Sequence, residues 1–147
     1  MILVNDGSTD RTGEIMESFS KVNPEIEVIN NPEPSGLGEH FKNGINKARC
    51  DYIIHLSGDN EITVDGFNNL INAIGSADLV IGNRANAFES RVLFRALLSY
   101  FFTHLINLIF GLKLNDIHGL VIFPVKILRG LDLQFVGYTQ QVELLVK

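Results

Sequence analysis

Short apolar runs alternate along the chain with longer segments in which apolar residues recur at helical spacing. The apolar runs have the length of strands and cover residues 1–4, 27–29, 52–56 and 79–81. Helical patterns cover residues 11–19, 37–48 and 64–74. This alternation is typical of a largely parallel sheet with helices on its faces. The pattern therefore predicts an α/β fold.

A polar turn, Asp6-Gly7-Ser8-Thr9-Asp10, joins the first predicted strand to the first predicted helix. Ligands of open α/β sheets bind beyond the carboxyl ends of the strands, so Asp6 and Asp10 are candidates for a ligand site. Asp10 is equally suited to cap the helix that follows. Taken alone, the turn leaves both interpretations open.

Two glycines, Gly36 and Gly38, flank Leu37 at the start of the second predicted helix. Such a pair lets a ligand approach the backbone, although a lone G-x-G is a weak signal. The sequence contains neither a G-x-x-x-x-G-K-[ST] loop nor a complete G-x-G-x-x-G motif. Phosphate-loop NTPases and ordinary dinucleotide-binding domains are therefore disfavoured.

Acidic residues also follow the third predicted strand, where Asp59 and Glu61 come shortly after Ser57. Mg²⁺ and Mn²⁺ prefer oxygen ligands and are often held by one or two carboxylates, with substrate phosphates completing the shell. The segment is therefore a candidate site for a divalent cation and a diphosphate. A solvated acidic turn is the alternative.

Composition narrows the class of protein. The 147 residues, 46% hydrophobic and 20% charged, are ordinary for one globular domain. A net charge of -5 without a Lys/Arg-rich run argues against a general nucleic-acid binder. The single cysteine, Cys50, excludes an internal disulfide and a cysteine-cluster metal site. These features favour a reducing, cytoplasmic location.

The most apolar segment, residues 97–112, reads LLSYFFTHLINLIFGL. Polar residues interrupt it, and it is short for a transmembrane span. Its apolar residues nearly encircle a helix, so the segment is either buried in the core or partly immersed in a membrane interface.

Several motifs, taken in chain order, resemble glycosyltransferase family 2, and within it the enzymes similar to dolichol or polyprenyl phosphate sugar synthases. The motifs are VNDGSTD at 4–10, GLG at 36–38, DYIIHLSGD at 51–59, ADLVIGNR at 77–84, residues 95–99 and NDIHG at 115–119. The resemblance implies an A-type glycosyltransferase fold, with a mostly parallel, Rossmann-like sheet, forming one partial catalytic domain over residues 1–147. It also implies transfer of a sugar from a nucleoside diphosphate sugar to an acceptor such as a polyprenyl phosphate at a membrane surface.

The resemblance assigns nucleotide-sugar binding to the first turn and to the second helix. Asp6 is expected to contact the nucleobase, and Gly7, Asp10 and Gly38 are expected to lie beside the nucleotide. In the family's D-x-D motif, which holds Mg²⁺ or Mn²⁺ on the diphosphate, Ser57 replaces the first aspartate. Asp59 is the second, and Glu61 takes the place of a further polar ligand.

The catalytic residues that the resemblance implies are Asp59, Arg84 and Asp116. Arg84 and Arg95 are expected to face the diphosphate, because guanidinium groups suit its developing charge. If the acceptor is a hydroxyl rather than an anionic lipid phosphate, Asp116 or His118 is the candidate base. For Asp116, capping of a turn is the alternative.

Family members also carry an earlier strand, which lies between the strands that bear Asp6 and Asp59. The chain is therefore expected to be truncated at both ends, with these two strands either paired with each other or loosely packed. The missing strand and Ser57 keep two further hypotheses open: an impaired nucleotide-sugar-binding module, and a membrane-associated interaction domain.

Overall fold

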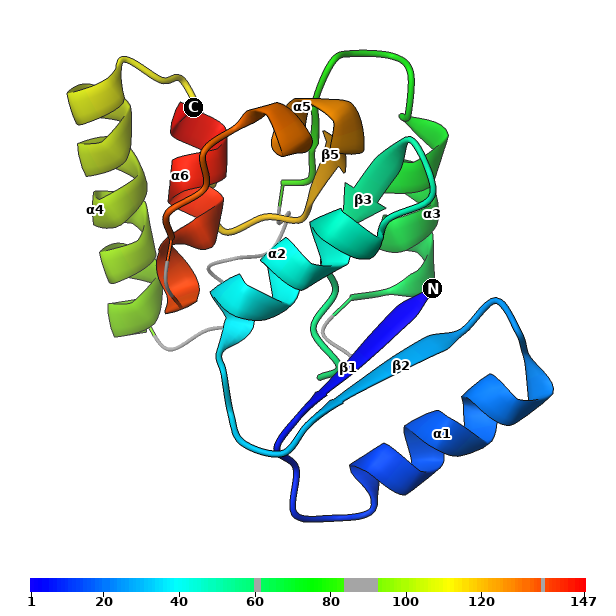
Figure 1. Cartoon of the computed structure of the whole chain (residues 1–147). Coiled ribbons are helices and arrows are strands. Elements are labelled where there is room, and N and C mark those ends of the chain that lie inside the picture. The colour runs from blue at the N-terminus through cyan, green and yellow to red at the C-terminus, as the bar shows by residue number, and fades with distance from the viewer. Residues whose placement is uncertain (60–61, 84–92, 136) are drawn as a thin grey trace. The chain divides into compact units, whose positions relative to one another are not determined.

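A computed structural model of the protein describes residues 1–59, 62–83, 93–135 and 137–147. The chain divides into two compact units, one formed by residues 1–47 and 134–140 and the other by residues 48–133 and 141–147. Figure 1 labels most of the helices and strands of both units.

The first unit begins with a β-α-β arrangement. Strands β1 (Ile2–Asp6) and β2 (Glu27–Asn31) are parallel, with Leu3 opposite Val28, and α1 (Thr12–Val22) connects them. Helix α2 (Leu37–Lys47) follows β2. Its apolar face buries Phe41 and Ile45, as the four-residue spacing predicts. The unit is completed by residues 134–140, which include the short 3-10 helix η1 (Gly137–Thr139).

The second unit contains a three-stranded sheet in the order β3-β5-β4. Strands β3 (Tyr52–Ile54) and β4 (Val80–Ile81) are joined through α3 (Val64–Asn72), and both pair antiparallel with β5 (Val121–Pro124). Helices α4 (Leu93–Phe110), α5 (Val125–Gly130) and most of α6 (Gln140–Val146) belong to the same unit. Its core is built from β5 and its neighbours and includes Ile117, Val121, Ile122, Phe123, Val125 and Leu128.

The predicted α/β alternation is confirmed, but the prediction of a mostly parallel sheet is wrong for the described strands. One strand pair is parallel and two are antiparallel. The difference arises from β5, an unpredicted strand that separates β3 from β4. Because both run opposite to β5, they run in the same direction as each other without being neighbours. Strand β1, which carries Asp6, and strand β3, which precedes Asp59, lie in different sheets.

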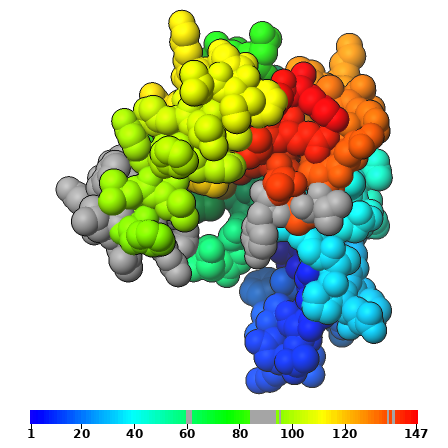
Figure 2. All heavy atoms as spheres, turned by 90° about the vertical axis from the view of Figure 1, so that its left-hand side faces the viewer, coloured from blue at the N-terminus to red at the C-terminus, as the bar shows by residue number. Residues whose placement is uncertain are grey.

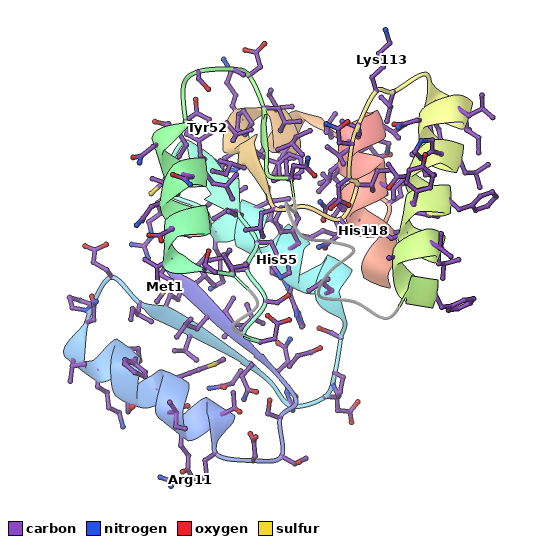
Figure 3. All side chains as sticks on the ribbon, turned by 180° about the vertical axis from the view of Figure 1, so that it is seen from behind. Met1, Arg11, Tyr52, His55, Lys113 and His118 are labelled. Carbon is purple, nitrogen blue, oxygen red and sulfur yellow. The ribbon has the colours of Figure 1, made fainter. Side chains whose placement is uncertain are left out.

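Helix α4 has one buried side and one exposed apolar side. Ala96, Thr103 and Ile106 are buried. The exposed side carries large apolar residues at helical spacing: Phe94, Leu97, Leu98, Phe101, Leu105, Leu108 and Ile109. Figure 2 shows α4 in yellow-green at the surface of its unit, and in Figure 3 many of its side chains extend away from the ribbon. Among the described residues, no helix is long and apolar enough to cross a membrane.

Candidate functional site

The turn after β1 is held tightly against the loop that follows β2. The Gly7 N–H donates to the Asn31 carbonyl oxygen at 3.1 Å. Gly7 has a φ of 70°, a conformation that favours glycine. A Cβ added there would lie 2.8 Å from Pro34 Cδ, so the turn has no space for a side chain. Gly7 therefore has a structural role, and its predicted place beside a nucleotide stays a prediction.

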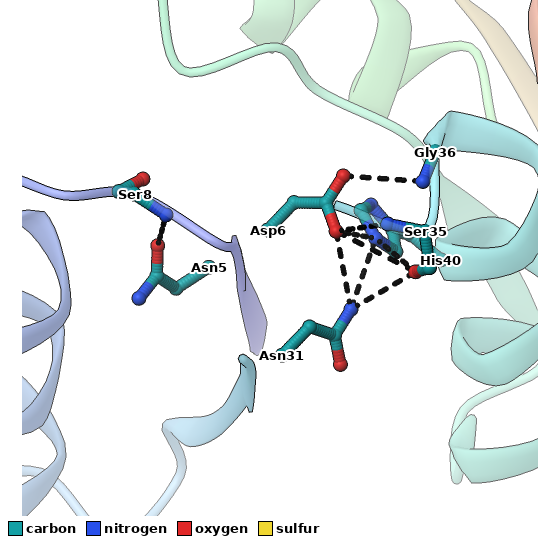
Figure 4. Close-up of polar contacts among 7 residues, drawn as sticks. All are labelled: Asn5, Asp6, Ser8, Asn31, Ser35, Gly36 and His40. Atoms are coloured by element: carbon teal, nitrogen blue, oxygen red, sulfur yellow. Dashed lines mark hydrogen bonds and ion pairs between the residues drawn. The ribbon is translucent and has the colours of Figure 1, made fainter. Parts of the chain in front are cut away.

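Asp6, the last residue of β1, accepts hydrogen bonds from residues of the β2–α2 segment (Figure 4). Its Oδ1 accepts from the Ser35 N–H at 2.8 Å and lies 2.8 Å from His40 Nε2. Its Oδ2 accepts from the Gly36 N–H at 3.1 Å, and Asn31 Nδ2 lies 3.4 Å from Oδ1. The carboxylate thus fixes the start of α2 to the carboxyl end of β1.

The surroundings of Asp6 favour its charged form. Partial burial acts to raise its pKa, but four hydrogen-bonding residues, led by Ser35 and Gly36, outweigh this effect. They lower the pKa from its ordinary value of 3.8 to about 2. With its ring proton on Nε2, His40 donates to Oδ1, and Asn31 Nδ2 lies 3.1 Å from the same ring nitrogen.

This pKa predicts an acid-sensitive contribution to stability. Because the pKa of Asp6 is lower in the folded chain than in the unfolded chain, the carboxylate stabilises the fold above about pH 4. That contribution is lost as the pH falls toward 2, through the folded pKa. Urea unfolding at stepped pH should show the free energy of unfolding falling over this range.

The variant Asp6→Asn should be less stable than the wild type at pH 7 and should lose less stability between pH 4 and pH 2. Asp78→Asn, at an exposed aspartate of the second unit, is the matched control and should follow the wild type. An unchanged acid transition in Asp6→Asn would show that the hydrogen bonds to Asp6 do not stabilise the fold.

Asn5 is a second polar residue that contacts the turn, and this role was not predicted from the sequence. Asn5 is buried, its Oδ1 accepts from the Ser8 N–H at 3.2 Å, and its Nδ2 donates to Asn30 Oδ1 at 3.0 Å. The amide therefore joins the turn to β2. Its polar character directly after the apolar residues 2–4 was the available signal. No comparable local signal marks His40, because its partners come from the preceding loop and from β1.

Asp10 and Gly38 also have structural roles. Asp10 Oδ1 accepts from the N–H of Thr12 at 2.9 Å, and hydrogen bonding to the side chain of Thr12, followed by this N–H, lowers the pKa of Asp10. The predicted cap is therefore displaced by one residue: Arg11 occupies the N-cap position of α1 without a side-chain cap hydrogen bond, and Asp10 instead accepts from the first N–H of the helix. A Cβ added to Gly38 would lie 3.0 Å from both the Gly137 nitrogen and Phe135 Cδ2, so Gly38 permits close packing of α2 on η1. Contact of Asp10 or Gly38 with a nucleotide stays a prediction.

The candidate metal residues belong to the second unit. Ser57 and Asp59 are exposed and follow β3, whereas Glu61 lies outside the described residues. Within the described part of the chain, no group of three or more His, Cys, Asp or Glu residues could hold a metal ion. A Mg²⁺ or Mn²⁺ ion that binds together with a diphosphate requires only one or two carboxylates. The exposed oxygen donors of Ser57 and Asp59 would fit such a shared metal–diphosphate site.

The remaining predicted residues are placed only in part. Arg84 and the side chain of Arg95 lie outside the described structure. Asp116 Oδ1 accepts from the N–H of His118 at 2.9 Å, as the turn-capping alternative predicts. The His118 ring, labelled in Figure 3, stacks on Phe102 of α4 with ring centroids 5.7 Å apart. The catalytic roles of Asp116 and His118 stay predictions.

Comparisons with known proteins all identify similarity to glycosyltransferases. Residues 1–131 match the family model of glycosyl transferase family 2. A dolichyl-phosphate beta-glucosyltransferase of Trichomonas vaginalis is 31% identical over 127 residues, which are 82% of this chain and 38% of that protein. An undecaprenyl-phosphate mannosyltransferase of Micrococcus luteus is 26% identical over 155 residues, covering 98% of this chain and 63% of that protein.

The glycosyltransferase GlyG of Streptococcus pneumoniae is 33% identical over 92 residues, which are 61% of this chain and 31% of that protein. The chain thus spans less than two thirds of the length of each of these relatives.

Proposed function

Because the chain belongs to glycosyltransferase family 2, we propose that residues 1–147 act as part of a catalytic domain that transfers a sugar from a nucleoside diphosphate sugar. The acceptor is a polyprenyl phosphate at the cytoplasmic face of a membrane. The family match over residues 1–131, with a charged Asp6 at the carboxyl end of β1, carries this proposal. The relatives named for dolichyl and undecaprenyl phosphate support the choice of acceptor.

In this proposal, Asp6 accepts a hydrogen bond from the nucleobase. The low pKa of Asp6 keeps it an acceptor at neutral pH. Arg84 and Arg95 bind the diphosphate and stabilise the charge that develops as it leaves, which makes charge stabilisation the main contribution of the protein. A lipid phosphate is already anionic, so Asp116 is needed as a base only for a hydroxyl acceptor.

Asp59 and Glu61, together with the neutral hydroxyl of Ser57, would hold Mg²⁺ or Mn²⁺ on the diphosphate. The bound ion would supply positive charge to the leaving group. Ser57 is a weaker ligand than the aspartate it replaces, because its oxygen carries no charge. This substitution favours the second candidate function, a module that binds nucleotide sugars but turns them over slowly.

The membrane contact is assigned to the exposed side of α4. Residues 97–112 contain no Asp, Glu, Lys or Arg, and Leu97, Phe101 and Leu108 are 53%, 65% and 82% exposed. Burying apolar side chains in the acyl boundary of a bilayer is favourable, by about 25 cal/mol per Å² of apolar surface. A polyprenyl phosphate resides in the bilayer, so an enzyme that uses it benefits from such a surface.

The intact protein is therefore expected to float with liposomes that contain undecaprenyl phosphate. The triple variant Leu97→Asn/Phe101→Asn/Leu108→Asn should remain in the aqueous fraction, because it removes apolar surface without disturbing buried side chains. The control Phe19→Asn/Val22→Asn removes exposed apolar residues from α1 and should float like the wild type. Recovery of the intact protein in the aqueous fraction alone would contradict the membrane contact.

The nucleotide function is tested by calorimetric titration with UDP and GDP sugars, with and without Mn²⁺. Metal-dependent binding accompanied by turnover is the result expected of the enzyme. Binding without turnover would support the binding module. If no donor binds, the chain is better explained as an interaction domain that retains the fold.

A further inference from the structure

The two oxygens of Asp6 differ in how many donors the protein supplies. Oδ1 accepts from the Ser35 N–H and from His40 Nε2, each at 2.8 Å, and Asn31 Nδ2 lies 3.4 Å away. Oδ2 receives one hydrogen bond from the described residues, from the Gly36 N–H at 3.1 Å. A carboxylate oxygen has about two lone-pair directions. Oδ1 is therefore fully used, whereas Oδ2 retains one direction for a ligand (Figure 4).

His40 is held in place as a donor to Oδ1. Its side chain is 10% exposed, compared with 26% for Asp6, so the imidazole is the more enclosed partner. Its Nε2 also lies 3.0 Å from Ser35 Oγ, which further limits rotation of the ring. The Nε2 nitrogen thus faces Asp6 Oδ1 and Ser35 Oγ, and Asn31 Nδ2 lies 3.1 Å from it.

Nucleobases place different demands on a carboxylate. Uracil offers one ring N–H between two carbonyl groups. Guanine offers a ring N–H and a neighbouring amino N–H, which together pair with both oxygens of a carboxylate. Where Oδ1 is already occupied, the amino group of guanine finds no acceptor, and a polar group left unpaired weakens binding.

Building on the proposed contact between Asp6 and the nucleobase, we propose that His40 is a positioning residue that selects the donor base. By occupying Oδ1, His40 restricts Asp6 to a single N–H at Oδ2. The site then favours uridine diphosphate sugars over guanosine diphosphate sugars. His40 acts through Asp6 and has no direct contact with the base.

The test is calorimetric titration of the full chain with UDP and with GDP, in the presence of Mn²⁺. Wild-type protein should bind UDP about tenfold or more tightly than GDP, the ratio expected for one unpaired polar group. His40→Ala frees a lone-pair direction on Oδ1, so the affinity ratio should fall to about threefold or less. His40→Gln keeps a side-chain N–H of similar reach and should restore the wild-type ratio.

A purely structural role for His40 would change both affinities equally and would not alter their ratio. Melting curves verify that each variant is folded, and His40→Phe, which keeps a ring but no N–H, replaces the alanine variant if that variant unfolds. An unchanged ratio in the folded variant, or a preference of the wild type for GDP, would overturn the role of His40 while leaving the proposed function intact. Failure of wild-type protein to bind either nucleotide would overturn both.

Discussion

Replacing Gly119 by alanine is expected to lower the free energy of unfolding by about 1–3 kcal/mol or more, the cost of forcing extra atoms into a packed site. Gly119 is buried, and an added Cβ would overlap the carbonyl oxygen of Gly82. The backbone at Gly82 has little freedom to move, because its N–H donates to the Leu120 carbonyl oxygen at 2.7 Å. Relief of the overlap therefore requires separation of two backbone segments next to β4 and β5.

Urea unfolding of Gly119→Ala and Gly130→Ala tests this contact within one unit. Gly130 ends α5, and a Cβ added there meets no atom within 4 Å. Alanine is also the better helix former, so Gly130→Ala should match the wild type or be slightly more stable. Equal unfolding midpoints for the two variants would show that the close approach of Gly119 to Gly82 is not a constraint on the fold.

Replacing Asp59 by asparagine is expected to lower sugar transfer by about a hundredfold or more, because the leaving diphosphate loses the carboxylate that would hold its metal ion. A second variant, Ser57→Asp, adds a charged ligand to the same segment and should tighten Mn²⁺ binding by about tenfold. Steady-state transfer rates and Mn²⁺ titrations measure the two effects separately.

Asp51→Asn is the matched control for Asp59→Asn. Asp51 is exposed and immediately precedes β3, whereas Asp59 comes after this strand. The control therefore removes one negative charge at the opposite end of β3. It should leave transfer and Mn²⁺ binding unchanged. Equal loss of activity in the two variants would assign the effect to overall charge and not to a metal site.

The features that were predicted correctly from the sequence depend on neighbouring residues. Asp10 accepts from the first N–H of α1 because that N–H lies only two residues later, although Arg11 occupies the N-cap position itself. The parallel pairing of β1 with β2 follows from the short β-α-β connection. Turn capping by Asp116 is local in the same way, and it was one of the alternatives that the sequence left open.

The features that were missed depend on residues far apart in the chain. Strand β5 pairs with β3, about 70 residues earlier, so its apolar sequence alone did not reveal that it would separate β3 from β4. His40 has an ordinary position within a helix, and only the folded loop brings it to Asp6. Hydrophobic spacing likewise identified α4 as a helix without distinguishing its buried side from its exposed side.

We propose that this chain takes part in the transfer of a sugar to a lipid phosphate. The most direct test of this proposal measures the movement of radiolabelled sugar from UDP-glucose or GDP-mannose to undecaprenyl phosphate in vesicles, with Mn²⁺ present. We expect label in the lipid extract that depends on enzyme, metal and acceptor, and that is strongly reduced in Asp59→Asn. Absence of lipid-linked label from protein that is folded and binds the donor would contradict it.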